Sequence, residues 1–264
     1  MSDSRPIGVF DSGLGGLCAV RELRRLLPEE NIVYFGDTGR VPYGTKSPET
    51  IKKYAREDAE FLLSKGVKLA LAACGTVSAV ALDEMKEHFP VPLFGVIAAS
   101  VDAALRETKT GAVAVIGTDA TIKSGLFDRK LREKGCADVI SRACPLFVPL
   151  VECGFIAREN ELTRGVAEMY LSDIGNSRTD TLILGCTHFP IISEIIGDVL
   201  PNITLIDPAK EAAALVAAYV RENGVGGSGG KTEYFVSDDA ESFSASAKIF
   251  LKTNEKINAS VVKI

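Results

Sequence analysis

The chain has 264 residues, of which 46% are hydrophobic and 25% are charged, and its formal net charge is −5. These values are ordinary for a globular protein, and the length suffices for one large α/β domain or two small ones. The acidic balance provides no general attraction for nucleic acid or anionic lipid, so we expect neither as a partner. No apolar run reaches 18 residues and the first residues do not resemble a signal peptide, so we expect a cytoplasmic location.

Short apolar runs alternate with longer amphipathic stretches along the whole chain. The apolar runs predict strands at residues 7–10, 32–35, 69–73, 93–96, 112–116, 181–184, 203–206 and 233–236. The amphipathic stretches predict helices at residues 48–64, 77–88, 119–134, 155–172, 209–223 and 240–251. This alternation predicts an α/β fold in which helices cover both faces of parallel sheets. Ligands of such sheets bind where the carboxyl ends of strands meet the following helices.

The first of these junctions is a glycine cluster, Asp11-Ser12-Gly13-Leu14-Gly15-Gly16. It follows a strand, and Asp37 ends the next one, which is the outline of a dinucleotide-binding loop. Cys18 stands where the third glycine of that fingerprint belongs, and Asp11 would place a negative charge beside a pyrophosphate. A nucleotide-binding module is therefore the weaker interpretation. Asp11 and Ser12 can instead contact a ligand or simply cap the next helix.

Two of the six cysteines follow apolar strands and precede helices. They lie in the segments Ala73-Cys74-Gly75-Thr76 and Gly185-Cys186-Thr187-His188. A free cysteine is usually a small buried hydrophobe, but a helix amino terminus stabilises a thiolate and can lower the thiol pKa. The two segments look like two versions of one local motif, one in each of two related halves of the chain. No Cys-x-x-Cys pair is present and the chain has only two histidines, so we expect no metal site.

Two further side chains are candidates on local sequence. His188 can act as a proton partner of the Cys186 thiol or bind a carboxylate, although a lone histidine is more often structural. Glu152 follows the apolar run 148–151, which we expect to deliver it to a strand end or a buried loop. A carboxylate there is as easily a capping group as a catalytic one. The glycine-rich segment 224–230 predicts a surface loop without a function.

Taken together, these segments resemble the glutamate racemase family within the aspartate/glutamate racemase superfamily. The matching segments occur in family order at residues 10–16, 34–38, 42–47, 73–76, 149–152 and 185–190, and the resemblance spans nearly the whole chain. It implies two similar flavodoxin-like domains that face each other across a cleft, formed by residues 1–97 plus 208–264 and by residues 98–207. It also implies a homodimer that inverts glutamate without cofactor or metal and supplies D-glutamate for peptidoglycan. The alternative is a racemase or related carbanion-forming enzyme of the superfamily acting on aspartate or another small acid.

The resemblance also implies roles for individual residues. Cys74 is expected to take the α-proton from D-glutamate and Cys186 that from L-glutamate, each thiol acting as the acid when the other is the base. Asp11, and Glu152 or His188, are implied to assist the respective thiols. The residues implied to bind substrate are Asp11, Ser12, Tyr43, Gly44, Gly75, Thr76, Thr187 and His188.

Position 75 departs from the family pattern. The family usually has Asn there, and its side chain helps to bind the substrate, whereas this chain has Gly75. Losing one buried hydrogen bond costs about 1–3 kcal/mol. From the sequence alone, we therefore expect Gly75→Asn to improve glutamate racemisation.

Overall fold

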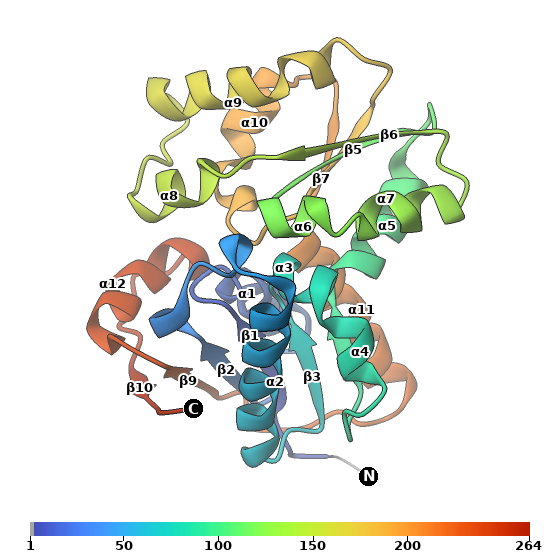
Figure 1. Ribbon diagram of the computed structural model, residues 1–264. Coiled ribbons are helices and arrows are strands. Elements are labelled where there is room, and N and C mark those ends of the chain that lie inside the picture. The colour runs from blue at the N-terminus through green and yellow to red at the C-terminus, as the bar shows by residue number, and fades with distance from the viewer. Residues whose placement is uncertain (1–2) are drawn as a thin grey trace.

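The protein is described by a computed structural model over residues 3–264, and residues 1–2, which begin the first predicted domain, lie outside the described part. Its strands form two separate sheets, one in each lobe of the molecule (Figure 1). The first sheet contains β1 (Ile7–Asp11), β2 (Ile32–Gly36), β3 (Leu69–Ala72), β4 (Leu93–Gly95), β9 (Thr232–Val236) and β10 (Ala259–Val261). The second contains β5 (Ala112–Gly117), β6 (Asp138–Ala143), β7 (Thr181–Leu184) and β8 (Thr204–Ile206). Every strand pairing in both sheets is parallel.

The two sheets share one topology. The first has the order β10-β9-β2-β1-β3-β4 and the second the order β6-β5-β7-β8, so four strands of each follow the order 2-1-3-4. This is the doubly wound, flavodoxin-like order, in which ligands bind outside the carboxyl ends of the first and third strands. The expected fold class, two similar parallel-sheet α/β halves, is confirmed. Cys74 and Cys186 follow β3 and β7, which are the third strands of the two halves.

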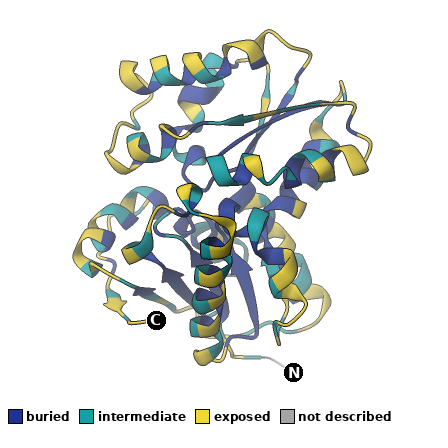
Figure 2. Ribbon diagram, viewed as in Figure 1, coloured by how far each residue is buried: buried dark blue, intermediate teal, exposed yellow. Residues whose placement is uncertain are grey.

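Helices cover both faces of each sheet, with their apolar sides buried and their outer sides exposed (Figure 2). The first half carries α1 (Leu17–Leu26), α2 (Pro48–Ser64), α3 (Gly75–Val80), α4 (Leu82–Lys86), α11 (Pro208–Glu222) and α12 (Ala240–Leu251). Helix α5 (Val96–Glu107) leads to the second half, which carries α6 (Asp119–Lys123), α7 (Leu126–Glu133), α8 (Phe147–Glu152), α9 (Glu161–Gly175) and α10 (Ser193–Val199). Short 3-10 helices are η1 (Thr38–Arg40), η2 (Tyr43–Thr45) and η3 (Phe189–Ile192). Among residues 3–264, no helix combines the length and the apolar composition needed to span a bilayer.

Local sequence signals explain why the long helices begin where they do. The Ser47 hydroxyl accepts a hydrogen bond from the Thr50 amide at the start of α2, and Pro48 occupies the first helical position. Asp207 caps α11 by accepting from the Ala209 amide at 2.9 Å. A capping side chain satisfies an amide that would otherwise lack a partner. The helices predicted at residues 48–64 and 240–251 are confirmed residue for residue.

The carboxyl-terminal segment returns to the first lobe, where β9 pairs with β2 and α12 lies beside the amino-terminal elements (Figure 1). Helix α11 packs against both α1 and α5. Val101 of α5 and Val216 of α11 belong to the same buried cluster as Val9 of β1 and Leu182 of β7. The apolar core is therefore continuous between the two sheets, which holds their carboxyl ends opposite each other.

The structure corrects several expectations about the elements. The stretches at 77–88 and 119–134 each form two short helices, the second broken at Gly125, whose φ is +65°. The helix expected at 155–172 begins at Glu161, because Asn160 caps it. Strands β6 and β10 were not expected, because both are partly exposed edge strands without a continuous apolar run. Glu152 ends helix α8 and is exposed, rather than lying at a strand end or in a buried loop.

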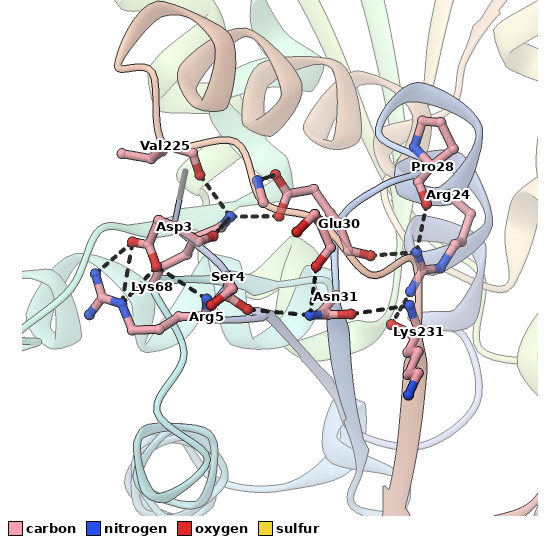
Figure 3. A network of polar contacts seen from close by, with 12 residues as sticks. Asp3, Ser4, Arg5, Arg24, Pro28, Glu30, Asn31, Lys68, Val225 and Lys231 are labelled. Carbon is pink, nitrogen blue, oxygen red and sulfur yellow. Dashed lines mark hydrogen bonds and ion pairs between the residues drawn. The ribbon is translucent and has the colours of Figure 1, made fainter. Parts of the chain in front are cut away.

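A buried ion pair fixes the opposite end of the first sheet (Figure 3). Lys68 lies just before β3, and its ammonium donates to Glu30 Oε2 at 2.5 Å and to the carbonyls of Asp3 and Val225. Glu30 also accepts from the Gly227 amide at 2.7 Å. The glycine-rich segment 224–230 is therefore tied to the chain segments that precede β1, β2 and β3.

Candidate active site

A cavity of about 330 Å³ lies between the carboxyl ends of the two sheets. This volume is at the lower end of the range for small-molecule sites. Ten of the residues predicted for the site line it: Ser12, Tyr43, Gly44, Cys74, Gly75, Thr76, Glu152, Cys186, Thr187 and His188. Asp11 is not part of the lining, because it is fully buried behind the neighbouring Ser12.

Cys74 is buried at the end of β3, directly before α3. Its sulfur lies 3.6 Å from the Ser12 hydroxyl. Burial, with the charge of Asp11 adding to it, raises the pKa of Cys74 to about 12. A raised thiol pKa is opposite to the lowered one expected at a helix amino terminus. In the free protein at neutral pH, Cys74 is therefore a protonated thiol that can act as an acid.

Cys186 has an imidazole next to it rather than a hydroxyl. Its sulfur lies 3.9 Å from His188 Nδ1, and His188 Nε2 lies 2.9 Å from Glu152 Oε1. Burial alone would lower the pKa of His188, but the hydrogen bonds and charges of Cys186 and Glu152 raise it to about 10. At neutral pH the imidazolium can then donate one proton to Glu152 and direct the other at the sulfur. The geometry thus makes His188 a bridge between the second thiol and a carboxylate.

Asp11 is an ionisable group that lies outside the cavity lining. Its Oδ2 accepts from the Gly13 amide at 3.1 Å, while Oδ1 is buried without a hydrogen-bond partner within residues 3–264. Burial raises the pKa of Asp11, and the positive charge of His188 opposes that change. A buried carboxylate oxygen without a donor is costly, so a cation or a polar hydrogen at this oxygen stabilises the site.

The glycine cluster after β1 allows close approach between the two halves. A Cβ at Gly15 would lie 2.0 Å from the Thr187 hydroxyl and 2.9 Å from His188 Nδ1. Only a residue without a side chain fits against the second cysteine segment. Asp37, which ends the second strand of the dinucleotide-binding outline, is fully buried and hydrogen-bonded by Tyr43 and Arg40. It is therefore not free to bind a ribose, as the nucleotide-binding interpretation of this cluster requires.

The space around Gly75 also contradicts an expectation. A Cβ at Gly75 would lie 2.3 Å from the carbonyl oxygen of Gly185, which belongs to the backbone of the opposite half. A side chain fits only if the two cysteine-bearing segments separate. This close contact argues against the expectation that Gly75→Asn improves the site, and the kinetics of that variant remain the test.

Thr118, which lines the cavity, and its buried partner Thr121 were not predicted from the sequence. The Thr118 hydroxyl lies 2.9 Å from the hydroxyls of both Thr76 and Thr121, and Thr118 lines the cavity. It follows β5, the first strand of its half, and so corresponds in topology to Ser12 after β1. A sequence signal existed in the Gly-Thr pair that ends this apolar strand before a helix.

Two α/β halves of matching topology thus present one thiol each to a shared cavity. The chain matches the family model for Asp/Glu/Hydantoin racemase over residues 18–216. It is 45% identical to the glutamate racemase of Aquifex aeolicus over 93% of each chain. The chain therefore belongs to the Asp/Glu/Hydantoin racemase family, and it is an amino-acid racemase.

Solved structures agree with this assignment. The glutamate racemase from Francisella tularensis in complex with D-glutamate superposes with a TM-score of 0.92 at 39% identity, covering 99% of this chain and 98% of that one. The glutamate racemase from Thermus thermophilus in complex with β-chloro-D-alanine gives a TM-score of 0.88 at 40% identity, covering 100% and 99%. The resemblance to glutamate racemases found in the sequence is confirmed.

Proposed function

We propose that the protein interconverts L- and D-glutamate by proton transfer between two thiols, without cofactor or metal, and thereby supplies D-glutamate for peptidoglycan. The single observation that carries the proposal is the position of Cys74 and Cys186, at equivalent strand ends on a shared cavity. Inversion of a carbon centre requires a base on one face and an acid on the other. The related Francisella protein, bound to D-glutamate, supports glutamate as the substrate.

In the proposed reaction, the Cys186 thiolate removes the α-proton of L-glutamate and the Cys74 thiol delivers its own proton to the opposite face. Afterwards Cys186 is a thiol and Cys74 a thiolate, which is the state that accepts D-glutamate. His188, held by Glu152, places a positive charge beside Cys186 in the starting state. Asp11 assists at Cys74, whose pKa its charge raises.

Substrate recognition is proposed to use the polar groups of the cavity wall. The hydroxyls of Ser12, Thr76 and Thr187 are available to donate to the substrate carboxylates and to the carbanionic intermediate. The hydroxyl of Tyr43 is not, because it is directed at Asp37 and Asp58. We propose instead that the Tyr43 ring and the Gly44 backbone shape the cavity wall. Gly75 is proposed to leave space for the substrate.

The division into residues 1–97 plus 208–264 and residues 98–207 remains a proposal, supported by the separate sheets that the two parts form. A homodimer in the cytoplasm, with glutamate as its small-molecule partner and no nucleic-acid partner, is likewise proposed. Size-exclusion chromatography with light scattering tests the dimer.

The first experiment is incubation of the purified protein with L-glutamate in D₂O, following optical rotation and α-deuterium in each enantiomer. Two separate thiols predict that deuterium enters the D-glutamate product first, while the remaining L-glutamate keeps its proton. Deuterium entering both enantiomers equally from the start would contradict the two-thiol mechanism. Inert glutamate together with racemised aspartate would instead favour the alternative substrate.

Cysteine variants provide the matched controls for this experiment. Cys74→Ala and Cys186→Ala are each expected to abolish racemisation. Cys153→Ala is expected to retain it, because Cys153 is exposed and does not line the cavity.

A further inference from the structure

Behind the cavity wall, the hydroxyl of Tyr43 lies between two carboxyl groups. It is within hydrogen-bonding distance of Asp37 Oδ2 and lies 2.9 Å from Asp58 Oδ2. Both aspartates are fully buried, and Tyr43 is nearly so. The three side chains come from different elements, because Asp37 follows β2, Tyr43 begins η2 and Asp58 lies on α2.

A count of hydrogens shows that two ionised carboxylates cannot both be satisfied here. A tyrosine hydroxyl has one hydrogen to donate, and an ionised carboxylate can only accept. If both aspartates were ionised, one of the two contacts would bring lone pairs of two oxygens together in a buried site. One carboxyl group must therefore carry a proton and donate it to the Tyr43 oxygen.

The remaining partners show which carboxyl group is protonated. Asp37 already accepts from Arg40 Nε at 2.6 Å and from the Ser237 hydroxyl at 2.7 Å, so both of its oxygens are used as acceptors. Asp58 Oδ1 accepts from Arg40 Nη2 at 3.0 Å, while within residues 3–264 Asp58 Oδ2 has only Tyr43 as partner. The free position for a hydrogen is thus Asp58 Oδ2.

The charges around Asp58 support the same assignment. In the described part of the chain, Arg40 supplies the one positive charge in contact with it, and the same guanidinium also pairs with Asp37 and Glu57. The other groups that act on the charge of Asp58 are Asp37, Tyr43 and, at longer range, Asp11. Burial, followed by the charge of Asp37, raises the pKa of Asp58 well above its usual range.

We propose that Asp58 is a neutral acid in the folded protein and that it donates to Tyr43, which in turn donates to Asp37, so that one directional chain positions the cavity wall. The wall is the segment 41–45, all of which lines the cavity. Gly44 of this segment packs directly on Thr118 of the other half. A Cβ added at Gly44 would lie 2.7 Å from Thr118 Cβ. Asp58 is thus a positioning residue that acts through Tyr43, and its kinetic effect rests on the proposed glutamate racemisation.

The protonation state can be measured without any substrate. Wild-type protein labelled with ¹³C at aspartate carboxyl carbons gives a chemical shift for Asp58 that distinguishes the acid from the carboxylate. The signal is assigned through the residue's own Cβ and backbone amide, so no variant has to fold. We expect the acid shift for Asp58 and the carboxylate shift for Asp37 at pH 7. A carboxylate shift for Asp58 would overturn the proposal.

Substitution of each aspartate provides a matched kinetic test. An Asn at position 58 presents an amide donor to Tyr43 and a carbonyl acceptor to Arg40, as the neutral acid does. We expect Asp58→Asn to keep kcat/KM within roughly threefold, and Asp58→Ala to lower it roughly tenfold or more through KM. Asp37→Asn should behave like the alanine variant, because its amide would face a donor from Arg40, Tyr43 or Ser237.

The outcomes separate this proposal from the proposed function. Equal losses in folded Asp58→Asn and Asp37→Asn would indicate an ionised Asp58 and overturn it. A protein that shows the acid shift for Asp58 but leaves glutamate unchanged would refute the proposed function alone.

Discussion

At Gly75 the backbone of one cysteine-bearing segment abuts the backbone of the other, since a Cβ would meet the Gly185 carbonyl at 2.3 Å. We predict that Gly75→Ala separates the two segments and lowers kcat roughly 10- to 100-fold, because misplacing reacting groups by about 1 Å can cost that much. Steady-state racemisation kinetics measure the change.

The control for this prediction is Gly165→Ala in the interior of α9, where an added Cβ meets no atom within 4 Å. That variant should keep full activity and gain slightly in stability, as glycine is a poor helix former. Unchanged or improved kinetics in Gly75→Ala, or in Gly75→Asn, would show that the two segments yield easily and that the steric argument fails.

The contacts of His188 with Cys186 and Glu152 make its own contribution to stability depend on pH. Since they raise the pKa of His188 to about 10, this imidazole binds more protons in the folded protein than in the unfolded chain between about pH 6.5 and 10. The stabilisation is therefore complete below about pH 6.5 and is lost as the pH rises toward 10. We predict that Glu152→Gln lowers the pKa of His188, so that the free energy of unfolding falls less steeply over this pH range.

Histidine NMR titration and urea unfolding at several pH values measure the two effects. Glu159→Gln is the matched control, because Glu159 lies near α8 in sequence but does not line the cavity. An unchanged His188 titration in Glu152→Gln would mean that the contact between the two side chains contributes nothing.

At the scale of elements, the junction between β5 and α6 has two roles. The Thr118 hydroxyl accepts from the Thr121 amide as a helix cap, and it contacts Thr76 across the cleft. We predict that Thr118→Val raises KM about tenfold and destabilises the protein by about 1 kcal/mol, the usual cost of losing such a cap. Thr118→Ser retains the hydroxyl and should restore both quantities, which kinetics and thermal unfolding measure. A KM unchanged in Thr118→Val would mean that the Thr118 hydroxyl lines the cavity without contributing to substrate binding.

The elements differ in how far the sequence predicts them. Strands such as β1 and β5 are buried along their whole length, so an unbroken apolar run marks them. The edge strand β6 is only partly buried and contains Ser141 and Arg142, which hides it. The break between α3 and α4 at Ala81 has no glycine or proline to signal it, and Leu82, which begins α4, packs closely on Gly95 from a distant segment.

The residues of the candidate site also differ in how far the sequence predicts them. The position of Cys74 and Cys186 at the cavity was predictable because each follows an apolar strand, and the role proposed for them comes from the family resemblance. The contact of Gly75 with Gly185 and the hydrogen-bond chain through Asp58 join residues from distant segments. No local pattern encodes such contacts, so only the folded structure reveals them.

At the scale of the whole molecule, the site depends on the carboxyl-terminal segment, which returns to the first half. Helix α12 brings Phe250 to 5.3 Å from the ring of His188, edge to face. The carboxyl-terminal segment thus helps to hold a residue of the second half, besides completing the first sheet. The relative position of the two thiols is therefore a property of the whole fold.

Variants of the buried ion pair between Lys68 and Glu30 test whether the cavity also depends on the far ends of the strands. Both side chains are almost fully buried, 2% and 3% exposed. Removing one partner leaves a buried charge alone, so Lys68→Met should destabilise the protein by about 3–5 kcal/mol in urea unfolding. The double variant Lys68→Met/Glu30→Met should recover only part of this loss. Its apolar side chains leave the Asp3 and Val225 carbonyls and the Gly227 amide without partners.

Activity should respond differently from stability. The pair lies before β2 and β3, at the ends of the strands opposite the cavity, and neither residue lines it. The folded fraction of Lys68→Met should therefore keep the wild-type KM. A raised KM would mean that the amino-terminal ends of the strands help to set the cleft. A loss of stability below about 1 kcal/mol would mean that water reaches the pair, which would make it equivalent to a surface ion pair.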